Sequence, residues 1–181
     1  KRNDQLKSHV VINANYLGAL ADPEHEMFWP CANIVAHELA HVAVAGWFEA
    51  HSPGLMLSPQ QGDFAIATLR NTAHTIWEEY AACRLSACIS CGETVTDGYV
   101  VGLETSIDGA MSNARERIKA YRTHAEVGRL LAETTTSVAN PLKMAAYLMG
   151  HLDGLDCKFD FNARCPKAYG SEFAPLLPRL L

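Results

Sequence analysis

The segment from residue 34 to residue 44, Ile-Val-Ala-His-Glu-Leu-Ala-His-Val-Ala-Val, is the most informative stretch of this 181-residue chain. It contains the pattern His37-Glu38-x-x-His41, which a shuffled chain of the same composition would contain only ~0.02 times. The surrounding apolar run, from about Pro30 to Phe48, predicts a buried helix. We therefore expect the chemistry of the chain to lie on this helix.

The spacing of the two histidines points to a metal ion. A helix places residues four apart on one face, so the imidazoles of His37 and His41 can both bind one zinc ion at about 2.0–2.1 Å. Burying two His and one Glu in an apolar stretch is costly unless they are paired or bind a metal. Glu38 is then placed to take a proton from water as general base and to return it to a leaving amine as general acid. The alternative is a core helix whose histidines are hydrogen-bonded.

A catalytic zinc site needs a third protein ligand. A second helix is predicted for residues 63–89, because its apolar residues recur at alternating steps of three and four, and it carries Glu78 and Glu79. At about 100° per residue, Glu79 projects about 75° from the apolar seam and Glu78 about 175°. We therefore expect Glu79 to be the third ligand and Glu78 to be solvated.

Two other groups of H-E-x-x-H enzymes do not match the sequence. Metzincins have a third His six residues after the second, with a Gly midway, where this chain has Trp47 and Val44. Peptide deformylases have an Asp before the second His, where this chain has Ala40.

The segments His37–His41 and Glu79-Tyr80-Ala81-Ala82 together resemble the gluzincin metallopeptidases, in which H-E-x-x-H is completed by a Glu from a later helix. Small ImmA/IrrE-type peptidases and other minimal gluzincins are the most similar in size. The resemblance implies a zincin-like domain with zinc as cofactor and a peptide or protein as substrate. It also implies a strand beside the substrate, for which Val10–Ala14 is the candidate. Cys83 stands where gluzincins often have an Asp that orients a ligand His.

The remaining patterns predict an α+β fold that is mainly helical, with a small sheet in a single domain over residues 1–181. The β-branched start of the segment Val10–Tyr16 predicts a strand. From residue 155 onward the composition predicts mostly loop. The other expected elements are a loop or flap over 49–62, a link or small hairpin over 90–104, a helix over 107–132, and a helix from N-cap Asn140 and Pro141 to Gly154.

The charge of the chain excludes some partner classes. Fifteen Lys and Arg against 20 Asp and Glu give a net charge of -5, so we expect no nucleic-acid partner and no anionic membrane partner. No run of 18 apolar residues is present, so no transmembrane helix is expected. The chain begins at Lys1 rather than Met, which indicates a processed or truncated piece. We expect a cytoplasmic protein.

The six cysteines are expected to be reduced thiols, because a chain of this length does not need disulfides. A different use of them is a structural ion held by Cys88, Cys91, Cys157 and Cys165, for which a single C-x-x-C is the signal.

A hydrolase also needs a donor for the oxyanion of the transition state. Tyr147 and His151 are four apart on the last predicted helix, and Tyr121 and His124 are three apart on the helix before it. The sequence does not choose between these pairs.

The sequence thus predicts a zinc-dependent peptidase with His37, His41 and Glu79 as ligands and Glu38 as general base and acid. The rival hypotheses are a catalytically inactive regulatory or binding module on the same scaffold, and a protein whose cysteines hold a structural ion.

Overall fold

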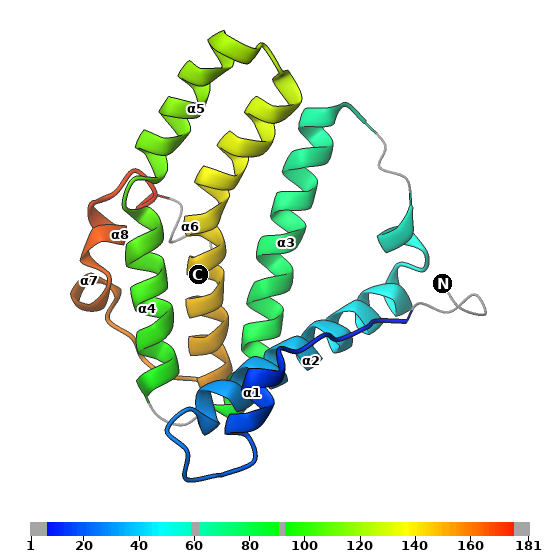
Figure 1. Ribbon diagram of the computed structural model, residues 1–181, viewed down its shortest axis with the longest axis vertical. Coiled ribbons are helices and arrows are strands. Elements are labelled where there is room, and N and C mark those ends of the chain that lie inside the picture. Colours follow the sequence, from blue (N-terminus) through cyan, green and yellow to red (C-terminus); the bar gives the residue numbers. More distant parts are fainter. Residues whose placement is uncertain (1–6, 59–61, 91–92, 176–181) are drawn as a thin grey trace.

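The computed structural model describes residues 7–58, 62–90 and 93–175, and every regular element in these ranges is a helix (Figure 1). The expected α+β fold with a small sheet is therefore wrong for this part of the chain. The elements in order are α1 (Ala14–Ala19), α2 (Phe28–His51), η1 (Leu55–Leu57), α3 (Phe64–Ser86), η2 (Ala87–Ile89), α4 (Glu93–Ile107), α5 (Ala110–His124), α6 (Val127–Leu155), α7 (Phe161–Arg164) and α8 (Pro166–Gly170).

The segment predicted as a strand leads into a helix instead. The side chain of Asn13 accepts a hydrogen bond from the backbone N–H of Asn15 at 3.0 Å and so caps α1. Val11 is 91% exposed and Val10 is 36% exposed, so these two β-branched residues before the cap are not part of a core. A substrate-binding strand at Val10–Ala14 is therefore not part of the described structure.

The two helices expected to carry the site are confirmed. The predicted helix over residues 30–48 is α2, which extends a few residues further at each end. The predicted helix over 63–89 is α3 together with η2, and the carboxylate of Asp63 caps it by accepting a hydrogen bond from the Ile66 N–H at 2.9 Å. The expected loop after α2 contains η1, and residues 59–61 lie outside the described part.

The second half of the chain is more helical than expected. The predicted link or hairpin over 90–104 is instead occupied by α4, apart from residues 91–92, which lie outside the described part. The helix predicted over 107–132 is divided between α5 and α6, because Ala125 has a left-handed φ of 55° and ends α5. Pro141 and Gly154, expected at the ends of a short helix, both lie inside α6.

Helix α6 is the centre of the architecture. It lies between α3 on one side and α4 with α5 on the other, and it runs in the same direction as α3 (Figure 1). Two glycines allow a close approach to α3: a Cβ at Gly150 would lie 2.2 Å from the carbonyl oxygen of Tyr80, and one at Gly154 would lie 2.3 Å from that of Arg84. The backbones of α3 and α6 therefore pack against each other without intervening side chains.

The end of the chain packs onto this frame rather than forming the expected loop. Helices α7 and α8 follow α6 and lie outside α4 (Figure 1). Glu104 of α4 accepts hydrogen bonds from the backbone N–H groups of Lys167 and Ala168 at 3.2 and 3.1 Å. A buried cluster joins these helices to α6 and so fixes α4 beside it; its members are Leu103, Ala145, Leu148, Leu152, Cys165 and Ala168.

None of the helices described here combines the length and the apolar character that a membrane crossing requires.

Candidate metal centre

His37 and His41 point from one face of α2 toward α3, as the spacing of four predicts. Their ring centroids are 4.6 Å apart with the planes at 89°, and the two Nε2 atoms are 3.0 Å apart. The Nε2 atoms of both imidazoles therefore meet at one point between α2 and α3. A metal ion at this point would need its third protein ligand from the facing helix, α3.

Glu79 supplies that group from α3. Its Oε2 lies 3.2 Å from Nε2 of His37 and 3.2 Å from Nε2 of His41. Ligands bound at 2.0–2.1 Å to a tetrahedral ion are separated by ~3.3 Å. The three donor atoms thus already have the mutual spacing that one small tetrahedral cation requires, and they form the one such group found in the described residues.

The electrostatics of the cluster favour positive charge. Hydrogen bonds to Glu78 and to Glu79 raise the pKa of His41 to about 10. Burial alone would raise the pKa of Glu79, but hydrogen bonds with His37, His41 and Tyr147 outweigh it and hold that pKa well below its usual range. A cation among these groups would therefore be stabilised by carboxylates that are already ionised.

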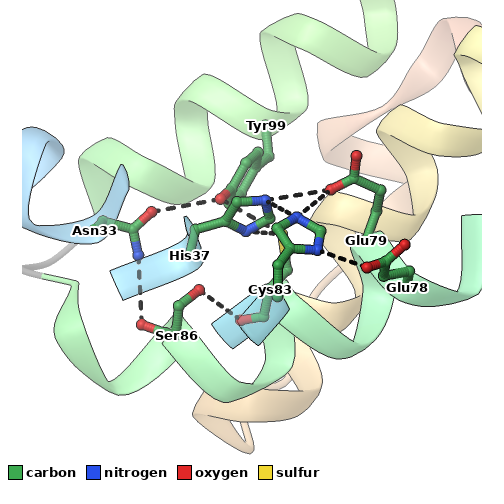
Figure 2. Close-up of polar contacts among 8 residues, drawn as sticks. Asn33, His37, Glu78, Glu79, Cys83, Ser86 and Tyr99 are labelled. Carbon is green, nitrogen blue, oxygen red and sulfur yellow. Dashed lines mark hydrogen bonds and ion pairs between the residues drawn. The ribbon is translucent and has the colours of Figure 1, made fainter. Parts of the chain in front are cut away.

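The nitrogens on the far side of both rings also have partners (Figure 2). Nδ1 of His37 lies 3.5 Å from Sγ of Cys83, and Nδ1 of His41 lies 3.4 Å from Oε1 of Glu78. Such contacts fix a ring so that its other nitrogen faces the ion. The expectation that Glu78 is solvated is therefore wrong: its side chain is only 27% exposed and it contacts His41.

A buried chain of polar groups continues from Cys83 (Figure 2). Its thiol is 3.6 Å from the hydroxyl of Tyr99, which donates to Oδ1 of Asn33 at 3.4 Å. The amide of Asn33 in turn donates to the carbonyl of Ser86 at 3.4 Å. Burial raises the pKa of Cys83 to about 12 and also raises that of Tyr99, so both groups are neutral. Cys83 is thus an uncharged partner of His37.

Of the side chains expected to donate to the oxyanion, Tyr147 is the one that contacts the His37–His41–Glu79 cluster. Its ring centroid is 5.6 Å from that of His37, edge to face, and it hydrogen-bonds to Glu79. Burial, then Glu79 and more weakly Glu38, raise the pKa of the phenol, so it keeps its proton. Glu38 directly follows His37 on α2, and its side chain is half-buried.

The other expected donors lie elsewhere. His151 is fully buried against the ring of Tyr99 at 5.3 Å, and neither of its ring nitrogens has a hydrogen-bond partner. Tyr121 and His124 contact each other on α5, with ring centroids 5.9 Å apart.

The cysteines expected to hold a structural ion do not gather among the described residues. Cys88 and Cys157 are exposed and Cys165 is buried in the core beside α8, all as free thiols. Cys91 lies outside the described residues.

Sequence reasoning missed Asn33, Tyr99 and the role of Glu78. A buried Asn four residues before His37 was the available signal for the first, since i and i+4 share a helix face. Tyr99 had no such signal, because its segment was predicted to be irregular.

Comparison with protein-family models, with curated proteins and with solved structures finds no match for the chain.

Proposed function

We propose that this chain is a zinc-dependent peptidase in which His37, His41 and Glu79 bind the ion and Glu38 is the general base and acid. The observation that carries the proposal is the mutual spacing of 3.0–3.2 Å among the three donor atoms. Two imidazoles and one carboxylate are a donor set typical of catalytic zinc, which keeps a fourth position for water or substrate. Because the pKa of His41 is raised, this imidazole has to release a proton when it binds the ion.

When bound, zinc supplies Lewis acidity, which lowers the pKa of water and polarises a carbonyl. Glu38 follows His37 directly on α2 and is half-buried, so we assign it as the group that accepts the proton of the attacking water and delivers it to the leaving nitrogen. Tyr147 keeps its proton because its pKa is raised, but its one O–H is used in the hydrogen bond to Glu79. To donate to the oxyanion that develops on the substrate carbonyl, this hydroxyl has to turn away from Glu79.

The ring partners prepare the donors for this task. With the proton on Nδ1, His41 can donate a hydrogen bond to Glu78 and His37 can donate one to Cys83. In these tautomers each Nε2 lone pair is free to bind the ion. Glu78 is charged and Cys83 is neutral, so only one of the two imidazoles gains additional basicity from a carboxylate.

We also propose that the protein is located in a reducing compartment such as the cytoplasm. This proposal is supported by the free thiols of Cys31, Cys83, Cys88, Cys157 and Cys165.

The test has two stages. Elemental analysis of the purified protein should find one zinc per chain, and this should be lost in the His37→Ala and His41→Ala variants. Glu38→Gln keeps all three donors, so it should retain zinc while hydrolysis of a peptide library falls by at least about 10²–10⁴-fold. If the wild-type protein binds zinc but cuts no peptide, the peptidase proposal fails and the inactive binding module takes its place.

A further inference from the structure

A groove lies between α3 and α6, on the side of the metal centre toward the start of both helices, and polar groups stand among its mainly apolar lining. Its volume is about 280 Å³, close to the lower end of the range for small-ligand sites, ~300 Å³. The lining residues used below are Thr72, Thr75 and Ile76 of α3, and Thr136, Asn140 and Lys143 of α6.

The groove is a continuation of the metal centre. Ile76 precedes Glu79 by three residues and Lys143 precedes Tyr147 by four, so both pairs are neighbours on one helix face. Helices α3 and α6 run side by side in the same direction (Figure 1). Both walls of the groove therefore lead toward the metal centre. Lys143 Nζ lies 5.5 Å from the ring centroid of Tyr147, the side chain that hydrogen-bonds to Glu79.

Lys143 gives the groove its charge. The side chain is half-buried and its ammonium lies over the Tyr147 ring, but it makes no ion pair with any carboxylate of the described residues. Lys167, by contrast, pairs with Asp108, and Arg115 pairs with Glu172. A half-buried ammonium without a carboxylate partner at the wall of a groove can be neutralised by an incoming anion.

The other polar groups divide into acceptors and donors. The hydroxyls of Thr72 and Thr136 donate to carbonyls of their own helices, at 2.9 Å and 2.8 Å, so they offer only lone pairs to a ligand. Asn140 has amide N–H groups and Thr75 has a hydroxyl that can donate. With Lys143, these provide charged and neutral donors for an anionic oxygen beside the metal centre.

We propose that this groove binds a carboxylate of the substrate, with Lys143 as the residue that selects it. The proposal deepens the proposed function and rests on it, because it names an acidic peptide as the substrate class of the same centre. The carboxylate can belong to an Asp or Glu side chain or to the C-terminus of the peptide, and the two sources share the same chemistry.

The test measures binding rather than turnover. Zinc-loaded protein with Glu38→Gln, which prevents cleavage, is applied to acetylated ten-residue peptides in which one position at a time is Glu or Gln and the C-terminus is amidated. A second set has Gln throughout the scanned positions and ends in a free carboxylate or an amide. Preference within the first set identifies a side-chain carboxylate, and preference only within the second identifies the C-terminus.

We expect the carboxylate form to bind about ten- to a hundredfold more tightly than its amide, as for a charge-assisted hydrogen bond. Lys143→Met should remove this preference and leave the zinc content unchanged. Lys119→Met, at an exposed lysine of α5, is the matched control and should keep the preference.

The outcomes separate the two proposals. Suppose that zinc is retained. The groove assignment is then wrong, and the zinc assignment stands, if carboxylate and amide peptides bind equally or do not bind. The same conclusion follows if the preference for the carboxylate persists in Lys143→Met. A Lys143-dependent preference in protein that holds no zinc would support the groove and overturn the zinc peptidase. Loss of both zinc binding and the preference in the parent protein would overturn both.

Discussion

Removing the Glu78 side chain should weaken zinc binding moderately, whereas removing Glu79 should weaken it much more. Both carboxylates contact His41, but at opposite nitrogens: Oε2 of Glu79 is 3.2 Å from Nε2, and Oε1 of Glu78 is 3.4 Å from Nδ1. Only the first lies where an ion would bind. The second acts through the orientation and basicity of the ring.

The size of the Glu78 effect follows from this geometry. Loss of a partner that orients a metal-binding His typically costs 10–100-fold in metal affinity. The 3.4 Å separation and the 27% exposure of the Glu78 side chain weaken its contact, so Glu78→Ala should fall at the lower end, about tenfold or ~1.4 kcal/mol. Glu78→Gln keeps an oxygen that can accept the Nδ1–H, so its loss should be smaller. Glu79→Ala removes a donor outright and should exceed both.

The assay is competition for zinc with a chromophoric chelator, at one pH and ionic strength for all variants. Glu116→Ala, at an exposed glutamate of α5, is the control for loss of one surface charge. If Glu78→Ala binds zinc as the wild-type protein does, the contact with His41 does not orient the ring. If it loses more affinity than Glu79→Ala, Glu78 is the ligand and the assignment of the third donor is wrong.

Two further predictions concern stability. Gly150→Ala should lower the free energy of unfolding by about 1–3 kcal/mol, because its methyl would lie 2.2 Å from the Tyr80 carbonyl oxygen; thermal melts test this against Gly18→Ala, which meets no atom within 4 Å and should not destabilise. His151 is buried without a hydrogen-bond partner and burial lowers its pKa, so the unfolded state binds its proton more readily and stability should fall as the pH drops below about 6.5. Urea unfolding at pH 7.5 and 5.5 should show a smaller pH dependence in His151→Leu, and an unchanged dependence would contradict the role of this histidine.

The residues of the candidate site could be predicted because their signal is local. A spacing of four on a helix brings His37 and His41 together whatever surrounds them. The position of Glu79 followed from the apolar seam of α3, whose later members Ile76, Tyr80 and Cys83 are half-buried or buried. The prediction that Glu78 is solvated was wrong because it assumed that α3 has a single packed face. In the structure α3 packs against both α6 and α2. The angle of about 175° from the seam therefore did not point to solvent.

The errors in the fold have two physical causes. Val10, Val11 and Ile12 have high β propensity, but a strand needs a partner, and the Asn13 cap begins a helix instead. Glycines in the second half were interpreted as turns although they serve helix packing. Gly102 of α4 lies against Met144 of α6, with an added Cβ 3.3 Å from its Sδ, and Gly154 lies against Arg84. One sequence alone does not distinguish a glycine needed for a turn from one needed for close approach.

The close approach of α6 to α3 is also what completes the candidate site. A Cβ at Gly150 would lie 2.2 Å from the Tyr80 carbonyl oxygen and 3.1 Å from Cβ of Cys83, so this glycine packs against the residue after Glu79 and against the partner of His37. Tyr147, one turn earlier on α6, therefore reaches Glu79, and Lys143, one turn earlier again, reaches the groove. A larger residue at Gly150 would separate the two helices where Tyr147 and Glu79 meet. The small residue thus sets the distance on which the hydrogen bond to the metal ligand and the position of the proposed carboxylate site both depend.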